Sequence, residues 1–230
     1  MVPTSSPDPK STLTVLVTGF GPFGPHTLNP SGQLAAELDG QSIAGARVVG
    51  RRLDTSTATV AGRLVDALDE LQPSVLICLG LAPGRPALSL ERVAVNVRDF
   101  PMPDNDGALP VDEPIDADGP DGRLSRLPLR AILHRWREQD IPGHISNTAG
   151  TYLCNQTMYL ACAESAARGI SAGFIHIPDT PQSAAAAGLT QPGPTMELAT
   201  MARALILAIE VCLAPQDFAA PLAVATGAVD

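Results

Sequence analysis

The sequence predicts an α/β protein, built as a single-domain three-layer sandwich in which helices cover both faces of a mostly parallel, twisted sheet. Two short and nearly uninterrupted apolar runs, "TLTVLVTGF" at 12–20 and "SVLICLG" at 74–80, are typical of strands buried on both faces. Segments with helical spacing alternate with such strands, which is typical of parallel sheets. The 230 residues contain neither a repeat nor a linker, so one domain is expected.

The first half of the chain supplies two strands and two helices. The strand at 12–20 stops at the loop "GPFGPHTLNP", and Ser31 is expected to cap a helix through "GQLAAEL". The stretch "ARVVGRRLD" at 46–54 predicts the second strand. A second helix is expected over 55–71, because its large apolar residues recur on one side. The buried strand at 74–80 follows it.

The second half begins with "ALSLERVAVNVRDF" at 87–100, which alternates like a strand. Residues 101–127 are rich in Pro, Asp and Gly, and a connection this long is often functional. The segment "LPLRAILHRWREQD" predicts an amphipathic helix, "GHISNTAG" a short strand, and "AGFIHIP" a further strand. A last helix is expected over 196–213.

The catalytic or binding domain is expected to span 13–214, with a flexible tail at 1–12 and another at 215–230. The first residues do not resemble a signal peptide, and the apolar runs are shorter than the roughly 20 residues that cross a bilayer. Four scattered cysteines without a CxxC pair indicate reduced thiols, so a cytoplasmic protein that binds no membrane is expected. A net charge of −9 without a Lys/Arg cluster argues against a nucleic-acid partner.

Cys154 is the cysteine whose position suggests chemistry. A strand is expected to end near Ser146, Gly150 allows a sharp bend, and a helix is expected to start at about Tyr152. The thiol then lies in the first helical turn, where free N–H groups and the helix dipole favour a thiolate. A buried structural cysteine remains the alternative, and it is the preferred interpretation for Cys78, Cys162 and Cys212, which lie inside apolar runs.

A nucleophilic cysteine needs a base, and His176 is the best placed of the four histidines because it lies near the carboxyl end of a predicted strand. A hydrogen-bonded core histidine is the alternative for this residue. Glu91 is conspicuous among apolar neighbours, since a buried carboxylate usually has a partner. Composition alone does not select the acid that would orient the base.

Two other kinds of site are weighed. The glycines of "TGFGPFG" follow a strand but match neither GxGxxG nor a P-loop, so a tight turn explains them as well as phosphate binding does. No HExxH motif or Cys/His cluster is present, and neither a metal nor a cofactor is expected.

Four segments together resemble the conserved blocks of the pyroglutamyl peptidases, in the same order along the chain. They are "VLVTGFGPFGPHTLNPS", "ERVAVNVRDFPMPDNDG", "SNTAGTYLCNQTMY" and "GFIHIPDTP". The resemblance implies a cysteine exopeptidase that hydrolyses the amide bond after an N-terminal pyroglutamyl residue of small peptides, through a thioacyl-enzyme. It also implies a homo-oligomer, either a dimer or a tetramer.

By motif match, the resemblance implies a triad of Cys154 as nucleophile, His176 as base and Glu91 as acid. It is the resemblance that selects Glu91. The substrate-binding residues that it implies are Phe20 and Phe23, which match the ring-binding phenylalanines, with Asn29, Leu81, Met102, Tyr152 and Leu153.

This chain departs from the family pattern at two positions. Leu81 replaces a glutamine associated with the lactam, and Pro101 replaces a basic residue whose role at the oxyanion site would fall to Arg98 or to backbone groups. Neither change touches the triad. Two rival hypotheses are an impaired relative that binds pyroglutamyl ligands without turnover, and a small-nucleotide binder that uses the glycine loop.

Overall fold

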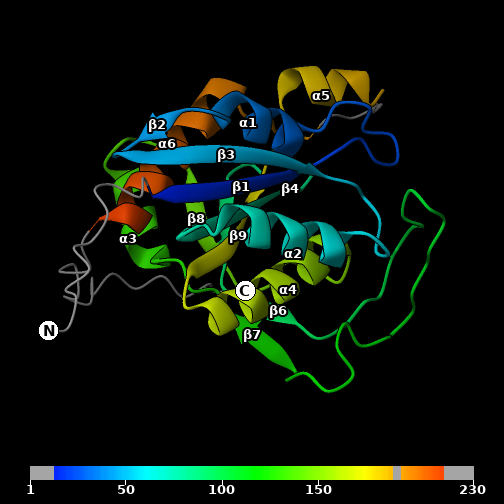
Figure 1. Cartoon of the computed structure of the whole chain (residues 1–230). Coiled ribbons are helices and arrows are strands. Elements are labelled where there is room, and N and C mark those ends of the chain that lie inside the picture. Colours follow the sequence, from blue (N-terminus) through cyan, green and yellow to red (C-terminus); the bar gives the residue numbers. More distant parts are fainter. Residues whose placement is uncertain (1–12, 189–192, 215–230) are drawn as a thin grey trace, which may run out of the picture.

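The computed structural model describes residues 13–188 and 193–214, in which helices cover both faces of a seven-stranded sheet (Figure 1). The order of the strands across the sheet is β2-β3-β1-β4-β9-β5-β8. These strands are β1 (Thr14–Phe20), β2 (Ser42–Ile43), β3 (Ala46–Leu53), β4 (Val75–Leu81), β5 (Leu88–Glu91), β8 (Gly143–Ser146) and β9 (Ser171–Ile177). A separate pair consists of β6 (Val93–Val95) and β7 (Gly122–Leu124). The predicted α/β class and the mostly parallel sheet are confirmed.

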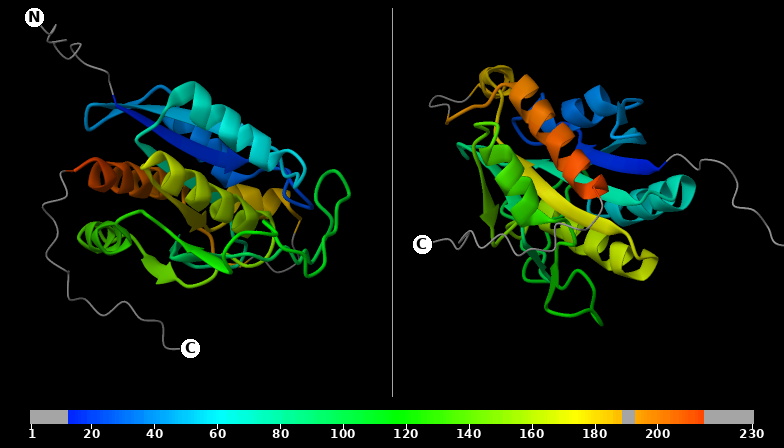
Figure 2. Two further views of the ribbon diagram at one scale, coloured as in Figure 1. Left: turned by 60° about the horizontal axis from the view of Figure 1, so that its bottom comes forward. Right: turned by 90° about the vertical axis from the view of Figure 1, so that its left-hand side faces the viewer.

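The helices form the two outer layers. They are α1 (Pro30–Leu38), α2 (Val60–Leu71), α3 (Leu129–Arg137), α4 (Leu153–Arg168), α5 (Pro181–Ala186) and α6 (Leu198–Leu213). Figures 1 and 2 show α1 and α6 on one side of the sheet and α2 and α4 on the other. Val15 and Val17 pack into the hydrophobic core between the sheet and helices α1 and α6, and Leu16 packs into the core between the sheet and helices α2 and α4. Successive side chains of a strand point to opposite faces, which explains the alternation. A strand buried in this way must be apolar throughout, as the sequence of β1 is.

Three strands, β2, β5 and β8, run against the direction of the other four. The edge strand β2 is antiparallel to β3, and β5 lies antiparallel to β9 while it pairs in parallel with β8. The reversal at β5 places Glu91 opposite Phe174 on β9. That register decides which side chains of the two strands meet.

The first helix differs in its cap from the sequence-based expectation. Asn29, not Ser31, is the N-cap, and its side chain accepts a hydrogen bond from the Ser31 backbone N–H at 3.1 Å. Pro30 then occupies the first helical turn, where its missing N–H costs nothing. Ser31 instead accepts the Phe20 N–H through its hydroxyl oxygen at 2.9 Å, which ties the helix to the end of β1.

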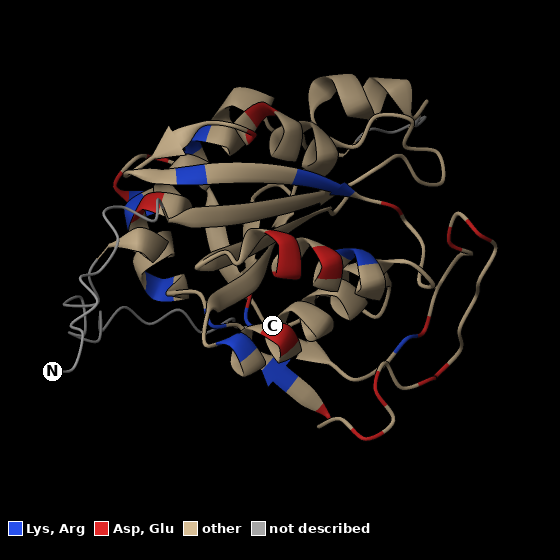
Figure 3. Ribbon diagram, in the orientation of Figure 1, with Lys and Arg blue, Asp and Glu red and all other residues tan. Residues whose placement is uncertain are grey.

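Two other predicted boundaries differ from the observed ones. The stretch 87–100, expected to alternate as a strand, contains two short strands, β5 and β6, which belong to different sheets. The second helix begins at Val60 rather than at Thr55, and residues 55–59 form a loop. The long connection 101–127 contains only the short strand β7, and part of it extends away from the sheet as an acidic segment (Figure 3). The two predicted tails, at 1–12 and 215–230, lie outside the described residues. Within the described ranges, no helix is both long and apolar enough to cross a membrane.

Candidate active site

Cys154 occupies the first turn of α4, as the sequence predicted. Strand β8 ends at Ser146, Gly150 adopts a φ of 76°, and Tyr152 is the N-cap of the helix. The first helical hydrogen bond is donated by the Gln156 N–H to the Tyr152 carbonyl at 3.2 Å, and no side chain caps the helix. The backbone N–H groups of the first turn, including that of Cys154, are therefore donors available to an anionic group.

His176 and Glu91 meet because of the antiparallel register of β5 and β9. Glu91 is paired with Phe174, so His176 is its diagonal neighbour on the same face, within reach of a long side chain. His176 Nδ1 lies 2.8 Å from Glu91 Oε1. The Glu91 side chain is 0% exposed, which makes this hydrogen bond a buried one. The contact fixes the orientation of the imidazole and directs its other nitrogen away from Glu91.

A glycine gives the Cys154 thiol its place beside this pair. Gly80 on β4 is the register partner of His176 on β9. A Cβ at Gly80 would lie 2.7 Å from Cys154 Sγ, so the sulfur occupies the space that a side chain would take. The three residues are thus gathered on the α4 face of the sheet, although no hydrogen bond joins Cys154 to His176. Catalytic hydrogen bonds often tighten only when substrate binds.

Electrostatics keep the thiol protonated. Burial raises the pKa of Cys154 to about 12, and the Glu91 charge adds to this effect while Arg85 opposes it. Burial also lowers the pKa of His176, even though Glu91 acts in the opposite direction. Both directions favour a neutral thiol and a neutral imidazole, because burial and the nearby carboxylate oppose the helix dipole.

Glu91 behaves in the opposite way. Burial acts to raise its pKa, but the hydrogen bond from His176 and further hydrogen bonds from Ser146 and Arg85 outweigh burial and bring the pKa below its usual value. The carboxylate is consequently ionised at neutral pH and accepts the His176 N–H.

A small cavity opens directly on Cys154. Its volume is about 40 Å³, and its lining consists of Phe20, Phe23, Asn29, Thr55, Leu81, Tyr152, Leu153 and Cys154. The aromatic side chains narrow it, since the rings of Phe23 and Tyr152 are 6.4 Å apart. Six of the seven residues anticipated for substrate binding line the cavity. Met102 does not, and its Cε instead lies against Gly24, in the loop that carries Phe23.

The asparagine of the cavity is already engaged. Asn29 donates from Nδ2 to the Gly21 carbonyl at 2.8 Å while its Oδ1 caps α1. Its side chain therefore holds the glycine loop in shape. Arg98, a candidate for the oxyanion site, donates to Glu113 at 3.1 Å and to Thr57 at 3.4 Å. Glu113 lies in the long connection and Thr57 in the loop before α2, so Arg98 is engaged away from Cys154 and the helix N–H groups are the better oxyanion donors.

Two residues escaped sequence reasoning. Thr55 is 3% exposed and lines the cavity, and its Oγ1 has no hydrogen-bond partner among the described residues. Arg85 forms an ion pair with Glu91 at 2.7 Å. Neither gave a usable signal, because Thr55 was assigned to a helix and Arg85 lies in a turn of "GLAPGR".

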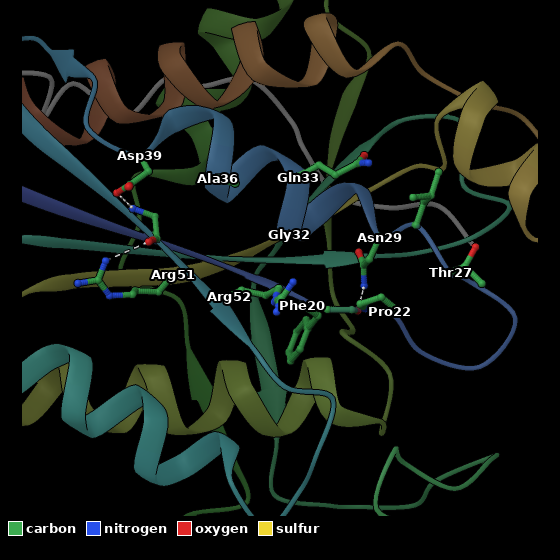
Figure 4. A pocket seen from close by; sticks show the side chains of 13 residues that line it. Phe20, Pro22, Thr27, Asn29, Gly32, Gln33, Ala36, Asp39, Arg51 and Arg52 are labelled. Atoms are coloured by element: carbon green, nitrogen blue, oxygen red, sulfur yellow. Dashed lines mark hydrogen bonds between the residues drawn. The ribbon is translucent and has the colours of Figure 1, made fainter.

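A larger hollow of about 470 Å³ lies beside the cavity, between α1 and the end of β3 (Figure 4). It shares Phe20 and Asn29 with the cavity, and Arg52 also lines it. Three of its polar side chains are engaged within the fold: Asn29 donates to the Gly21 carbonyl, Asp39 accepts the Gly50 N–H at 2.9 Å, and Arg51 donates to the Gly50 carbonyl. Within the described part of the chain, no cluster of three metal-binding side chains occurs.

Comparison with known proteins gives concordant matches. The profile of the pyroglutamyl peptidase family matches residues 13–215. The pyrrolidone-carboxylate peptidase of Chromobacterium violaceum is 44% identical over 201 residues, which cover 87% of this chain and 92% of that protein. The Pyrococcus furiosus protein of the same name is 43% identical over 204 residues, covering 87% and 98% of the two chains.

Solved structures agree with the sequence matches. The pyrrolidone carboxyl peptidase from Thermococcus litoralis superimposes with a TM-score of 0.83 at 40% identity, covering 87% of this chain and 93% of that one. A mutant of the Pyrococcus furiosus enzyme gives a TM-score of 0.84 at 42% identity, with 87% and 98% coverage.

Proposed function

The chain belongs to the pyroglutamyl peptidase family, and we propose that it removes the N-terminal 5-oxoproline residue from small peptides, with Cys154 as nucleophile, His176 as base and Glu91 as the orienting acid. The observation that carries the assignment of roles is the hydrogen bond of 2.8 Å between His176 Nδ1 and Glu91 Oε1. It leaves Nε2 as the nitrogen that receives the thiol proton.

The reaction begins with transfer of the Cys154 proton to His176 Nε2 as the sulfur attacks the amide carbonyl carbon. The carbonyl oxygen becomes an oxyanion, which the free N–H groups of the first turn of α4 stabilise. The intermediate collapses as the C–N bond breaks, and the imidazolium gives its proton to the leaving amine. His176 then deprotonates a water that attacks the thioester. This step releases 5-oxoproline and returns the proton to Cys154.

The cavity at Cys154 receives the lactam ring. The cavity is small, with a volume of about 40 Å³, so it suits a compact ring. Apolar walls suit an uncharged ring, and the unpartnered Thr55 hydroxyl supplies a hydrogen bond that Leu81 does not offer. We expect Thr55→Val to raise KM for a pyroglutamyl amide severalfold while kcat changes little.

Residues 13–214 act as one catalytic domain in this proposal. The four cysteines are free, which suits the cytoplasm.

The chain assembles as a dimer or tetramer, and the exposed Leu109 and Val111 offer apolar surface for such contacts. Light scattering of the purified chain tests the assembly, and a monomer at micromolar concentration would rule it out.

The decisive experiment measures the release of a chromogenic amine from its pyroglutamyl amide under reducing conditions. Wild type should turn over and Cys154→Ala should not. Cys162→Ala is the matched control, because Cys162 is a buried cysteine of the same helix and lies outside the cavity. Equal activity of wild type and Cys154→Ala would refute the role of the thiol. Binding of pyroglutamyl ligands without any turnover would indicate an impaired relative. In that case Leu81→Gln would be the first substitution to test, because it restores the glutamine of the family pattern.

A further inference from the structure

Arg85 makes the second contact to the buried carboxylate of the triad. It lies in the short loop between β4 and β5, directly after Gly84, which adopts a φ of 82°. Its Nη1 donates to Glu91 Oε1 at 2.7 Å. The Glu91 side chain is 0% exposed and that of Arg85 is 30% exposed. The guanidinium therefore reaches inward from the surface to a group that water does not contact.

Both donors use the same carboxylate oxygen. Oε1 accepts from Arg85 at 2.7 Å and from His176 at 2.8 Å, whereas Oε2 has no hydrogen-bond partner among the described residues. A carboxylate torsion has a broad and nearly two-fold profile, so nothing intrinsic to Glu91 holds Oε1 in place. Without the Arg85 contact, the carboxylate would keep two uncharged partners, His176 and the Ser146 hydroxyl, and could rotate and exchange its oxygens.

We propose that Arg85 is a positioning residue of the active site, which holds the Glu91 carboxylate charged and turned so that Oε1 faces His176 Nδ1. The inference rests on the proposed function, because it presumes that Glu91 orients the base. Arg85 itself touches neither the nucleophile nor the scissile bond in this role. A bidentate-capable, permanently charged guanidinium suits such a contact better than an ammonium group does.

The charge of Arg85 also acts on the neighbouring titratable groups. Those that both Arg85 and Glu91 affect, besides His176, are Cys154 on α4 and His144 on β8. Burial is the main cause of the lowered pKa of His176, and Arg85 lowers it further while Glu91 acts to raise it. Loss of Arg85 should therefore raise the pKa of His176 as long as Glu91 remains ionised.

His144 provides a second reporter of the same charge. Burial lowers its pKa, Arg85 lowers it further, and Glu91 opposes both. The remaining two histidines have other carboxylate neighbours, with Asp179 lying 3.7 Å from His26 and Glu138 lying 3.3 Å from His134. Ring resonances of all four histidines can be followed in one NMR titration, in which His26 and His134 serve as internal references.

The test compares Arg85→Met and Arg85→Lys with wild type. Arg168→Met is the matched control, since Arg168 is a similarly exposed arginine that pairs with two carboxylates at the far end of α4. Each protein is titrated by NMR, and its kcat and KM for a pyroglutamyl amide are measured from pH 5 to 9. Circular dichroism establishes that each variant is folded.

In Arg85→Met we expect kcat to fall roughly tenfold or more, KM to change less than about twofold, and the His176 and His144 midpoints to move to higher pH. Arg85→Lys should restore the two midpoints and part of kcat. A stable Arg85→Met with wild-type kcat and midpoints would overturn the proposal, as would loss of stability alone. If Arg85→Met does not fold, an Arg85→Lys protein with wild-type kcat would overturn it. If wild type shows no turnover while Arg85→Met still shifts the midpoints of His176 and His144, only the proposed function is refuted.

Discussion

At the scale of single residues, the absence of a side chain at Gly80 matters to the site as much as the side chains that are present. Gly80 supplies no side chain, and that space holds the Cys154 sulfur beside the strand of His176. Burial then keeps this sulfur protonated, with its pKa raised to about 12. We therefore expect the nucleophile to be generated by proton transfer to His176 during the reaction rather than to exist beforehand as a thiolate–imidazolium pair.

Alkylation of Cys154 by iodoacetamide should reveal this difference. Because burial raises the pKa of Cys154 to about 12, the thiolate fraction and the alkylation rate should climb steadily from pH 6 to above pH 9. Mass spectrometry of quenched samples gives the rate for each cysteine. A plateau reached below pH 8 would mean that a thiolate–imidazolium pair exists at rest.

The pH dependence of turnover follows from the base. Burial lowers the pKa of His176 below the ordinary value of 6.5, and His176 must be neutral to accept the thiol proton. The acid limb of kcat/KM should therefore have its midpoint below pH 6.5, with activity lost as the pH falls through it. Initial rates in buffers of constant ionic strength measure this midpoint, and a value above 7 contradicts a neutral base.

Gly80→Ala should damage the site through sterics. The new Cβ would lie 2.7 Å from Cys154 Sγ and 2.7 Å from Phe174, so the sulfur must move. We expect kcat/KM to fall at least about tenfold and stability to fall by about 1–3 kcal/mol. Gly62→Ala on α2 is the control, because a Cβ there meets nothing within 4 Å. Activity assays and urea unfolding test both, and a fully active Gly80→Ala would show that the thiol has more room than this.

At the level of elements, α4 has to be held firmly, since its first turn carries the nucleophile. Asn155, the next residue, is fully buried and joins the helix to the β6 segment. Its Nδ2 donates to the Val95 and Val97 carbonyls at 2.8 and 2.9 Å, and its Oδ1 accepts the Val95 N–H at 2.9 Å. One side chain thereby satisfies three backbone groups of an otherwise irregular segment.

Asn155→Ala should cost about 1–3 kcal/mol of stability, because it leaves those backbone groups without partners. Asn147→Ala, at an exposed position before α4, should change stability by less than about 0.5 kcal/mol. Chemical denaturation followed by circular dichroism measures both. A loss for Asn155→Ala no larger than for Asn147→Ala would show that water replaces the side chain at no cost.

Prediction from sequence succeeded where an element has its own signature. The apolar runs of β1 and β4 and the bend at Gly150 before α4 carry their structure locally, and they placed Cys154 correctly. The partner of His176 has no local signature, because the contact depends on β5 being antiparallel to β9 and hence on pairing between distant segments. Thr55 was missed because it was assigned to a helix and Arg85 because it lies in a turn, and Glu91 was selected only through resemblance to a family.

At the scale of the whole molecule, the site is assembled from every part of the described chain. Phe20 lies at the end of the first strand, Glu91 near the middle, and Cys154 and His176 on elements of the second half. Asn105 of the long connection also donates to the Pro22 carbonyl at 3.0 Å, which ties the acidic segment to the glycine loop. A ligand in the cavity would therefore contact several segments that are distant in sequence, and these contacts would be lost when the protein unfolds.

Product binding should for this reason stabilise the whole fold. At a concentration of free 5-oxoproline a hundred times its Kd, the gain in unfolding free energy is about 2.7 kcal/mol. Differential scanning fluorimetry should show a rise in Tm with 5-oxoproline but none with ATP at equal concentration. A shift with ATP alone would favour the nucleotide-binding hypothesis for the glycine loop.

The protonated state of Cys154 also bears on how the protein withstands oxidants. Peroxide converts thiolates to sulfenic acid, and susceptibility follows thiolate character and exposure. A nucleophile whose pKa is raised to about 12 by burial should therefore react slowly with peroxide between turnovers. We expect the same burial that makes the thiol slow to ionise to slow its oxidation.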